Sequence, residues 1–138
     1  MKRYVFDSYA ILAFLEDEKG ADLVEKALRE VVANKARGFL SVINWGEIYY
    51  SIMREQGQGQ AEVVLAYVSN YPLELVDADL DLTRVAARLK GRYRIAYADC
   101  FAAALAKKNK AVVLTGDPEF KLLENEVKVK WITLVGLM

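Results

Sequence analysis

Short runs of consecutive apolar residues alternate along this chain with segments whose apolar residues recur at every third or fourth position. The first pattern is typical of strands buried on both faces, and the second of helices with one buried face. Parallel strands need a crossover connection, usually a helix, whereas a tight hairpin can join antiparallel strands. The alternation therefore predicts an α/β fold in three layers, with helices on both faces of a central, mostly parallel sheet of about four to five strands.

Five segments carry the strand pattern, and the last of them is a candidate edge strand: residues 3–6, 38–40, 73–76, 111–115 and 128–133. Six segments carry the helical pattern, and a further short helix is expected up to residue 123: residues 8–15, 21–33, 41–54, 61–69, 82–91 and 96–108. Gly57 and Gly59 predict a flexible joint between two of these helices. The helix over 96–108 is apolar nearly all round, so we expect it to be buried centrally.

The length of 138 residues suits one domain, which we expect to span 1–138. Hydrophobic residues make up 54% of the chain, which excludes a disordered protein. No apolar run approaches the roughly 18 residues of a membrane span, and no signal-peptide cleavage site follows the apolar stretch near the N-terminus. The single cysteine, Cys100, excludes an internal disulfide and suits a reducing compartment. We therefore expect a cytoplasmic protein with no membrane partner.

The chain contains no histidine. This absence excludes Ser-His and Cys-His nucleophile pairs, a histidine general base and the usual histidine-ligated zinc site. Cys100 is expected to be a buried small apolar residue, because no neighbour in the sequence would lower the pKa of its thiol. Any chemistry must therefore use carboxylates, amines, phenols or hydroxyls.

Acidic residues stand at four junctions between predicted elements. Asp7 follows the first strand and Asp117 follows the fourth. In open α/β sheets the binding crevice lies beyond the carboxyl ends of the strands, where the strand order reverses. In an order of about 3-2-1-4-5 the first and fourth strands are neighbours, so these two carboxylates would converge. Glu47 shares a helix face with Asn44, and Asp99 opens the long apolar helix.

Each acidic residue also has a purely structural interpretation. Asp7 could cap a helix, Asp99 could favour a helix dipole, and Asp117 could be a turn residue. Glu47 could be a solvated surface residue. The surroundings of Asp99 favour a function, because an unpaired carboxylate among alanine, cysteine and aromatic neighbours would be costly.

Four carboxylates in one crevice would repel each other, since two unit charges about 4 Å apart cost about 4 kcal/mol at an effective dielectric near 20. Protons or a cation must offset this repulsion. An all-oxygen site matches Mg²⁺ or Mn²⁺, hard cations that keep several waters and bind phosphates. A water bound to such a metal becomes a nucleophile at neutral pH, so hydrolysis at phosphorus would need no imidazole.

Four segments carry a resemblance to a known family: VFDS at 5–8, SVINWGE at 41–47, YADC at 97–100 and LTGDPEF at 114–120. In their order, spacing and junction positions they resemble the PIN-domain ribonucleases, specifically the VapC toxins of prokaryotic toxin–antitoxin pairs. The resemblance covers essentially the whole chain. It implies a single PIN-like domain that cleaves RNA to 5′-phosphate and 3′-hydroxyl ends, forms a homodimer and is inhibited by a small cognate antitoxin.

The resemblance also assigns roles to individual residues. The implied acidic quartet, which would bind Mg²⁺ or Mn²⁺ and support catalysis, is Asp7, Glu47, Asp99 and Asp117. Of these, Asp7 and Asp99 correspond to the firmest metal ligands, whereas the other two could act through water. The polar positions that would orient the site are Ser8, Asn44 and Thr115. Glu119 could assist, although we expect it to be a solvated loop carboxylate.

Lys plus Arg equals Asp plus Glu at 19 each, yet the charge is unevenly distributed. The segment 84–110 holds eight basic residues and one acidic residue, so it carries +7 and the remainder −7. The basic side chains could form a cationic rim for RNA phosphates, or they could be ordinary surface and helix-end residues. The RNA-binding candidates are Arg84, Arg88, Arg92 and Arg94, the last two because they are expected in a loop. Some of the eight tyrosines and two tryptophans could stack on unpaired bases, although core positions are the alternative.

Rival functions remain open at this point. A phosphatase of the aspartate type needs a second Asp two residues after the first, and that position is Tyr9. A phosphoreceiver needs paired acids at the first strand, which are absent here. A PIN-domain nuclease of RNA processing that is not a toxin, or a catalytically weak binding module, would share the same residues. Metal dependence of activity would separate an enzyme from a binding module.

Overall fold

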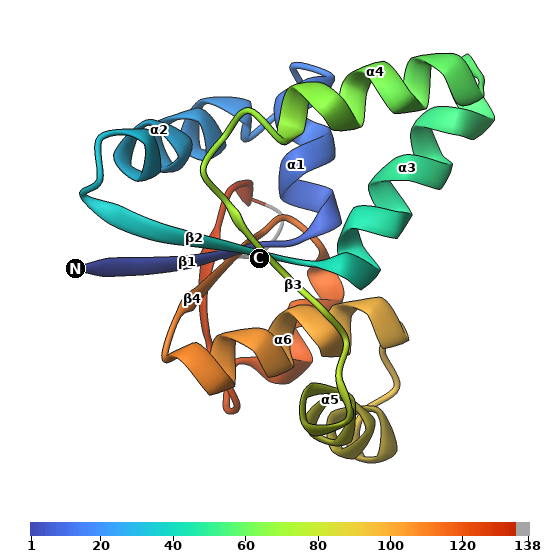
Figure 1. Cartoon of the computed structure of the whole chain (residues 1–138). Coiled ribbons are helices and arrows are strands. Elements are labelled where there is room, and N and C mark those ends of the chain that lie inside the picture. The colour runs from blue at the N-terminus through green and yellow to red at the C-terminus, as the bar shows by residue number, and fades with distance from the viewer. Residues whose placement is uncertain (135–138) are drawn as a thin grey trace.

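The computed structural model describes residues 1–134, and it arranges them in three layers around a parallel sheet (Figure 1). The strands are β1 (Lys2–Phe6), β2 (Ala36–Ser41), β3 (Glu74–Val76), β4 (Val112–Thr115) and β5 (Lys128–Trp131). The helices are α1 (Ser8–Leu15), α2 (Ala21–Val32), α3 (Val42–Gln56), α4 (Gln58–Val68), α5 (Leu80–Arg92) and α6 (Tyr97–Asn109), with a short 3₁₀ helix η1 (Pro118–Leu123) before β5.

The strands lie in the order β3-β2-β1-β4-β5, and every neighbouring pair is parallel. The predicted fold class and strand order are thus confirmed, and the sheet is fully parallel. The strands β2 and β3 lie on one side of β1, and β4 and β5 lie on its other side. The strand order therefore reverses between β1 and β4. Phe6 pairs in register with Leu114, so the residues that follow β1 lie beside the last residue of β4.

The core is divided by the sheet into two apolar clusters. Tyr4 and Phe6 point to the side covered by α1 to α4, whereas Val5 points to the side covered by α5 and α6. Figure 1 shows these two groups of helices on opposite faces of the sheet. Leu114 and Val113 of β4 divide in the same way, as expected for side chains that alternate along a strand. The central strands β1, β2 and β4 are therefore largely buried on both faces, which explains their continuous apolar runs.

Helix α6 lies in the core, as its composition predicted. All its residues from Asp99 to Ala106 are buried, including the thiol of Cys100. Burial also raises the pKa of that thiol to about 11, in line with a structural cysteine. Among residues 1–134, no helix is both long enough and apolar enough to cross a membrane.

Two predictions of local structure were wrong. Gly59 was expected in a flexible joint, but α4 begins at Gln58 and includes it, so the turn between α3 and α4 is Gly57 alone. Gly57 has a φ of 91°, which only glycine adopts without strain, and it lets the chain reverse in one residue. Arg92 was expected in a loop, but it is the last residue of α5, because that helix runs past Gly91.

Candidate active site

The side chain of Asp7 lies at the carboxyl end of β1, where it is 1% exposed. Its Oδ1 accepts a hydrogen bond of 2.8 Å from the backbone N–H of Ala10, so the residue does cap α1. Its Oδ2 is buried and has no hydrogen-bond partner within the described chain. A cap needs only one of these oxygens, and the second is therefore available to a ligand.

Thr115, the last residue of β4, connects Asp7 to the loop that carries Asp117. Its Oγ1 accepts a hydrogen bond of 3.0 Å from the backbone N–H of Asp117. Its hydroxyl also lies near enough to the carboxylate of Asp7 to lower the pKa of Asp7. Burial outweighs this contact and raises the pKa of Asp7 to about 7, and the charges of Asp117 and Glu47 add to the rise.

A second group of carboxylates surrounds the first turn of α6. One carboxylate oxygen from each of Asp99, Asp117 and Glu119 lies within 4.8 Å of the other two. Asp99 is 6% exposed, and its Oδ2 is buried without a partner in the described chain. Burial raises the pKa of Asp99 far above its ordinary value, and the hydrogen bond and charge of Asp117 raise it further. The negative charge of Asp7 also contributes to this rise, so Asp7 is close enough to Asp99 for their charges to interact.

The position of Glu119 differs from the prediction. It is not a solvated loop carboxylate, because it is partly buried and its Oε2 accepts a weak hydrogen bond of 3.4 Å from the N–H of Ala96. Asp117 caps η1 by accepting from the N–H of Glu119 at 3.0 Å, and this tight turn brings the two acidic side chains together. The spacing Asp-Pro-Glu, with proline at the start of a helical turn, was the signal available in the sequence.

Glu47 is held at the edge of the site by the two polar residues expected to orient it. Ser8 donates a hydrogen bond of 2.7 Å to Oε1 of Glu47, and Asn44 donates one of 3.2 Å to the same oxygen. The amide of Asn44 also reaches the carbonyl of Ala98 at 3.3 Å, which ties α3 to the first turn of α6. Oε2 of Glu47 accepts no hydrogen bond from residues 1–134.

The predicted cationic rim is only partly present. Arg84 lies 3.6 Å from Asp81, and Arg92 lies 3.7 Å from Glu126, so acidic neighbours offset both charges. Arg94 lies exposed in the loop before α6, and no ion pair to it occurs among residues 1–134. Arg94 therefore remains the basic residue best placed to approach a ligand at the amino end of α6.

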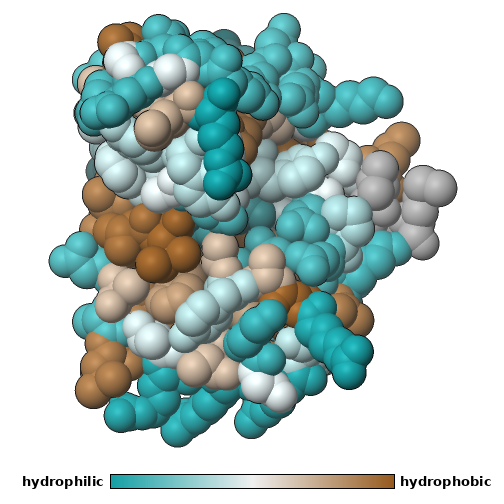
Figure 2. All heavy atoms as spheres, turned by 90° about the vertical axis from the view of Figure 1, so that its right-hand side faces the viewer, coloured by the Kyte–Doolittle hydropathy of each residue, from teal (hydrophilic) through white to brown (hydrophobic). Residues whose placement is uncertain are grey.

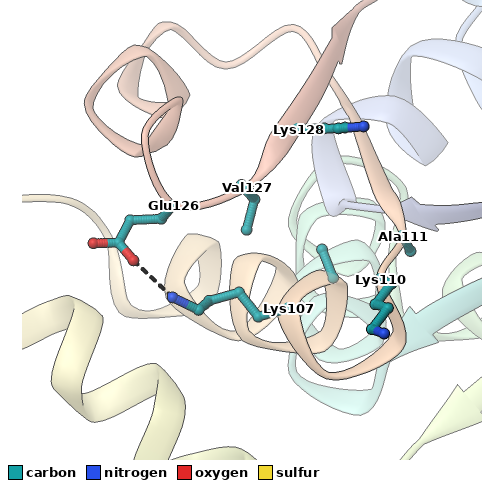
Figure 3. A pocket seen from close by; sticks show the side chains of 7 residues that line it. Lys107, Lys110, Ala111, Glu126, Val127 and Lys128 are labelled. Carbon is teal, nitrogen blue, oxygen red and sulfur yellow. Dashed lines mark hydrogen bonds and ion pairs between the residues drawn. The ribbon is translucent and has the colours of Figure 1, made fainter.

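The lysines of the basic segment lie at the other end of α6. Figure 3 shows a pocket of about 320 Å³ there, in which Lys107 pairs with Glu126 at 2.7 Å. Lys110 and Lys128 also line it. A helix of 13 residues is about 20 Å long, so these lysines are remote from Asp99. They complement the negative end of the α6 dipole, which is the structural interpretation of this part of the segment.

The donor set fits a hard divalent cation. Two buried carboxylate oxygens, one on Asp7 and one on Asp99, have no partner within the described chain, and Asp117 and Glu119 present further oxygens beside Asp99. Burial and the neighbouring negative charges raise the pKa values of Asp7 and Asp99, so their protonated forms are favoured without a cation. Figure 2 faces this side of the molecule, where hydrophobic areas interrupt a largely hydrophilic surface. A ligand that reaches the carboxylates would meet apolar and polar groups together.

Comparison with known proteins agrees with this geometry. The sequence pattern of the PIN domain matches residues 4–126. The chain is 32% identical over 125 residues to a ribonuclease VapC of Mycolicibacterium smegmatis, and the alignment covers 87% of this chain and 95% of that relative.

Solved structures share the fold at lower identity. VapBC2 from Rickettsia felis, bound to a DNA fragment from its promoter, has a TM-score of 0.72 at 18% identity and covers 94% of this chain and 98% of its own. DNA-bound VapBC from Salmonella typhimurium has a TM-score of 0.73 at 17% identity, with coverage of 96% and 100%. A VapC toxin of Mycobacterium tuberculosis that cleaves the sarcin-ricin loop has a TM-score of 0.67 at 16% identity, with coverage of 88% and 94%. With its fold, acidic site and sequence match in agreement, the chain belongs to the PIN-domain family, as a homologue of the VapC ribonucleases.

Proposed function

We propose that this protein is an endoribonuclease that depends on Mg²⁺ or Mn²⁺ and acts in the cytoplasm as the toxin of a toxin–antitoxin pair. The observation that carries the proposal is the pair of buried, unpartnered carboxylate oxygens on Asp7 and Asp99, surrounded by three more acids. A purely structural role would leave these oxygens capped or solvated. The ribonuclease activity of the 32% identical relative supports the choice of RNA as substrate.

The acidic residues of the site would hold the metal, and the neighbouring polar residues would orient them. Asp7, Asp99 and Asp117, with Glu47 at the edge, would hold the metal, and Glu119 is close enough to join them. When bound, the metal lowers the pKa of its water and offsets negative charge on the phosphate. Thr115 fixes the loop that carries Asp117, and Ser8 with Asn44 fixes Glu47. These hydrogen bonds hold the carboxylates in place before the substrate arrives, which is how an electrostatic site avoids reorganisation during reaction.

Cleavage of RNA by the purified protein tests the proposal. We expect mixed RNAs to be cut with Mn²⁺ or Mg²⁺ and to stay intact with chelator. Asp7→Asn and Asp99→Asn should lose at least about a hundredfold in rate, because each removes a charged ligand of the site. The matched control is Asp22→Asn, which removes an exposed carboxylate on α2 and should cleave like the wild type. Equal cleavage by all proteins, or cleavage in chelator, would contradict the assignment.

A groove between α1, α3 and α4 supports the proposed antitoxin partner. It has a volume of about 480 Å³ and an apolar lining with few charges: Phe14, Leu15, Glu16, Ile52, Gln56, Gln60, Val63, Val64 and Tyr67. Val63 is 63% exposed there, more than its apolar side chain would favour in a surface that stays bare. VapBC structures pair a toxin of this fold with an antitoxin, and we propose that this groove receives an apolar segment of the cognate one.

The charge at the end of this groove favours a basic partner. Glu16 lies beside Glu18 and Glu55, and its contact with Glu18 is the main reason that the pKa of Glu16 rises to about 7. No Lys or Arg pairs with these three carboxylates within residues 1–134. A cationic side chain of the antitoxin would relieve their repulsion, so we propose that its docking segment carries Lys or Arg at this point. The homodimer implied by the family remains a prediction that size-exclusion chromatography with light scattering would check.

A further inference from the structure

One aromatic side chain packs against the loop that carries Asp117. Tyr9 follows Asp7 by two residues, and its ring packs against Gly116, the residue between Thr115 and Asp117. A Cβ atom at position 116 would overlap the ring, with Cζ of Tyr9 at 2.8 Å and Cδ1 at 3.0 Å. The absence of a side chain at Gly116 is therefore what lets the ring rest on the loop that carries Asp117.

The ring of Tyr9 is available to a ligand. The residue is 39% exposed although it belongs to the first turn of α1, immediately beside a carboxylate that is buried. Within residues 1–134, its hydroxyl makes no hydrogen bond and its ring forms no pair with another aromatic ring. Core packing accounts for the side that touches Gly116, but it leaves the exposed part without a structural role.

Another tyrosine flanks the site from α6, and it differs in a useful way. Tyr97 precedes Asp99 by two residues and is 44% exposed. Its ring centroid lies 5.0 Å from that of Phe101, so part of its surface is already used within α6. Tyr9 is thus the ring near the carboxylates that has exposed surface and no aromatic partner.

We propose that Tyr9 is a positioning residue on which an unpaired nucleobase next to the scissile phosphate stacks. This inference rests on the proposed ribonuclease function and adds the substrate feature that the site would recognise. A phosphate held at the carboxylates carries its flanking bases only a few ångströms away, and unpaired bases are usually gripped by aromatic rings. The site would therefore favour single-stranded segments and loops, because a base in a duplex is already stacked on its neighbours and cannot turn toward Tyr9.

The test measures how much the base at each position around the scissile phosphate contributes to kcat/KM. A single-stranded RNA oligonucleotide is first cut by the wild type to map the scissile phosphate, and versions with one abasic nucleotide at each flanking position are then compared. We expect one abasic position to lower kcat/KM of the wild type by about tenfold to a hundredfold, the range of one base–aromatic stack. Tyr9→Leu should show a similar loss on the intact RNA and no further loss on that abasic RNA.

Companion variants separate stacking from structure. Tyr9→Phe and Tyr9→Trp keep a ring and should keep the abasic penalty, whereas Tyr9→Met covers Gly116 without a ring and should lose it. Tyr50→Leu removes a tyrosine of α3 that is 44% exposed and lies beneath Arg54, and it should behave like the wild type. Equal abasic penalties in the wild type, Tyr9→Leu and Tyr9→Met would overturn the role of Tyr9. Failure of the wild type to cut any RNA would instead overturn the ribonuclease assignment.

Discussion

At the scale of single residues, the acidic side chains combine two roles that sequence reasoning had set against each other. Asp7 caps α1 through one oxygen and presents the other to the site, and Asp117 caps η1 while it lies beside Asp99. The interpretations of Asp7 as a helix cap and of Asp117 as a turn residue were thus correct but incomplete. Asp7 and Asp117 could be singled out from sequence because strand ends are visible in the apolar pattern, whereas Glu47 and Asp99 were singled out by their positions on predicted helices. For Glu119, the Asp-Pro-Glu spacing indicated a helical turn, but it did not show that this turn brings the Glu119 carboxylate to Asp99.

The buried charge of Asp7 has a measurable effect on stability. In the folded, metal-free protein its pKa is raised from 3.8 to about 7, so the protonated form is favoured. The stability that this preference contributes is complete below about pH 4 and is lost as the pH rises through 7, a change of about 4 kcal/mol. Asp7→Asn removes the charge and keeps an oxygen for the cap of α1.

We therefore expect metal-free Asp7→Asn to gain thermal stability relative to the wild type as the pH rises from 4 to 8. Unfolding temperatures measured by calorimetry in chelator, at several pH values, would check this. Saturating Mn²⁺ should reverse the order at pH 8, because a cation that binds only the folded state stabilises it. A variant that is less stable than the wild type at every pH in chelator would show that the carboxylate serves mainly as a cap.

At the scale of elements, glycines decide details that periodicity does not reveal. The apolar spacing located the six helices and five strands, because burial sets that pattern. It could not show which of Gly57 and Gly59 forms the turn, since both residues suit a joint equally well in the sequence. In the structure only Gly57 has a positive φ, and Gly59 is an ordinary helical residue with open space beside it.

Two glycine-to-alanine substitutions should accordingly have opposite effects. In β2, a Cβ at Gly38 would lie 2.6 Å from Cδ2 of Leu73 and 3.1 Å from Cε1 of Phe6. We expect Gly38→Ala to destabilise the fold by about 1 to 3 kcal/mol through overpacking. Gly59→Ala, the matched control in α4, should stabilise it by about 0.5 to 1 kcal/mol because alanine favours a helix. Urea unfolding of both variants measures the sign of each change in the free energy of unfolding. A Gly38→Ala variant as stable as the wild type would mean that Leu73 moves aside freely.

At the scale of the whole molecule, topology places the acidic residues and the apolar groove on different parts of the surface. The carboxylates gather where β1 and β4 end, whereas the groove lies beyond α1, between α3 and α4. The site and the strand order followed from the alternation of strands and helices. The groove did not, because it depends on how far α4 leans from α1, and that tilt is set by packing rather than by any local pattern.

A cationic antitoxin segment in this groove would make binding depend on salt. The partner to use is the small protein whose coexpression suppresses the toxicity of this chain, and affinity is measured by calorimetry at 50 and 500 mM salt. Coulombic attraction between exposed charges is screened at the higher concentration, so wild-type binding should weaken there.

Glu16→Gln combined with Glu55→Gln should weaken binding about tenfold at low salt and flatten its salt dependence, because attraction to the acidic cluster is reduced. Asp81→Asn, which removes a charge on α5 across the sheet, should leave both quantities unchanged. Val63→Asp should abolish binding at either salt concentration, because it places a charge among the apolar residues that line the groove. An affinity that Val63→Asp leaves intact would place the antitoxin elsewhere on the molecule.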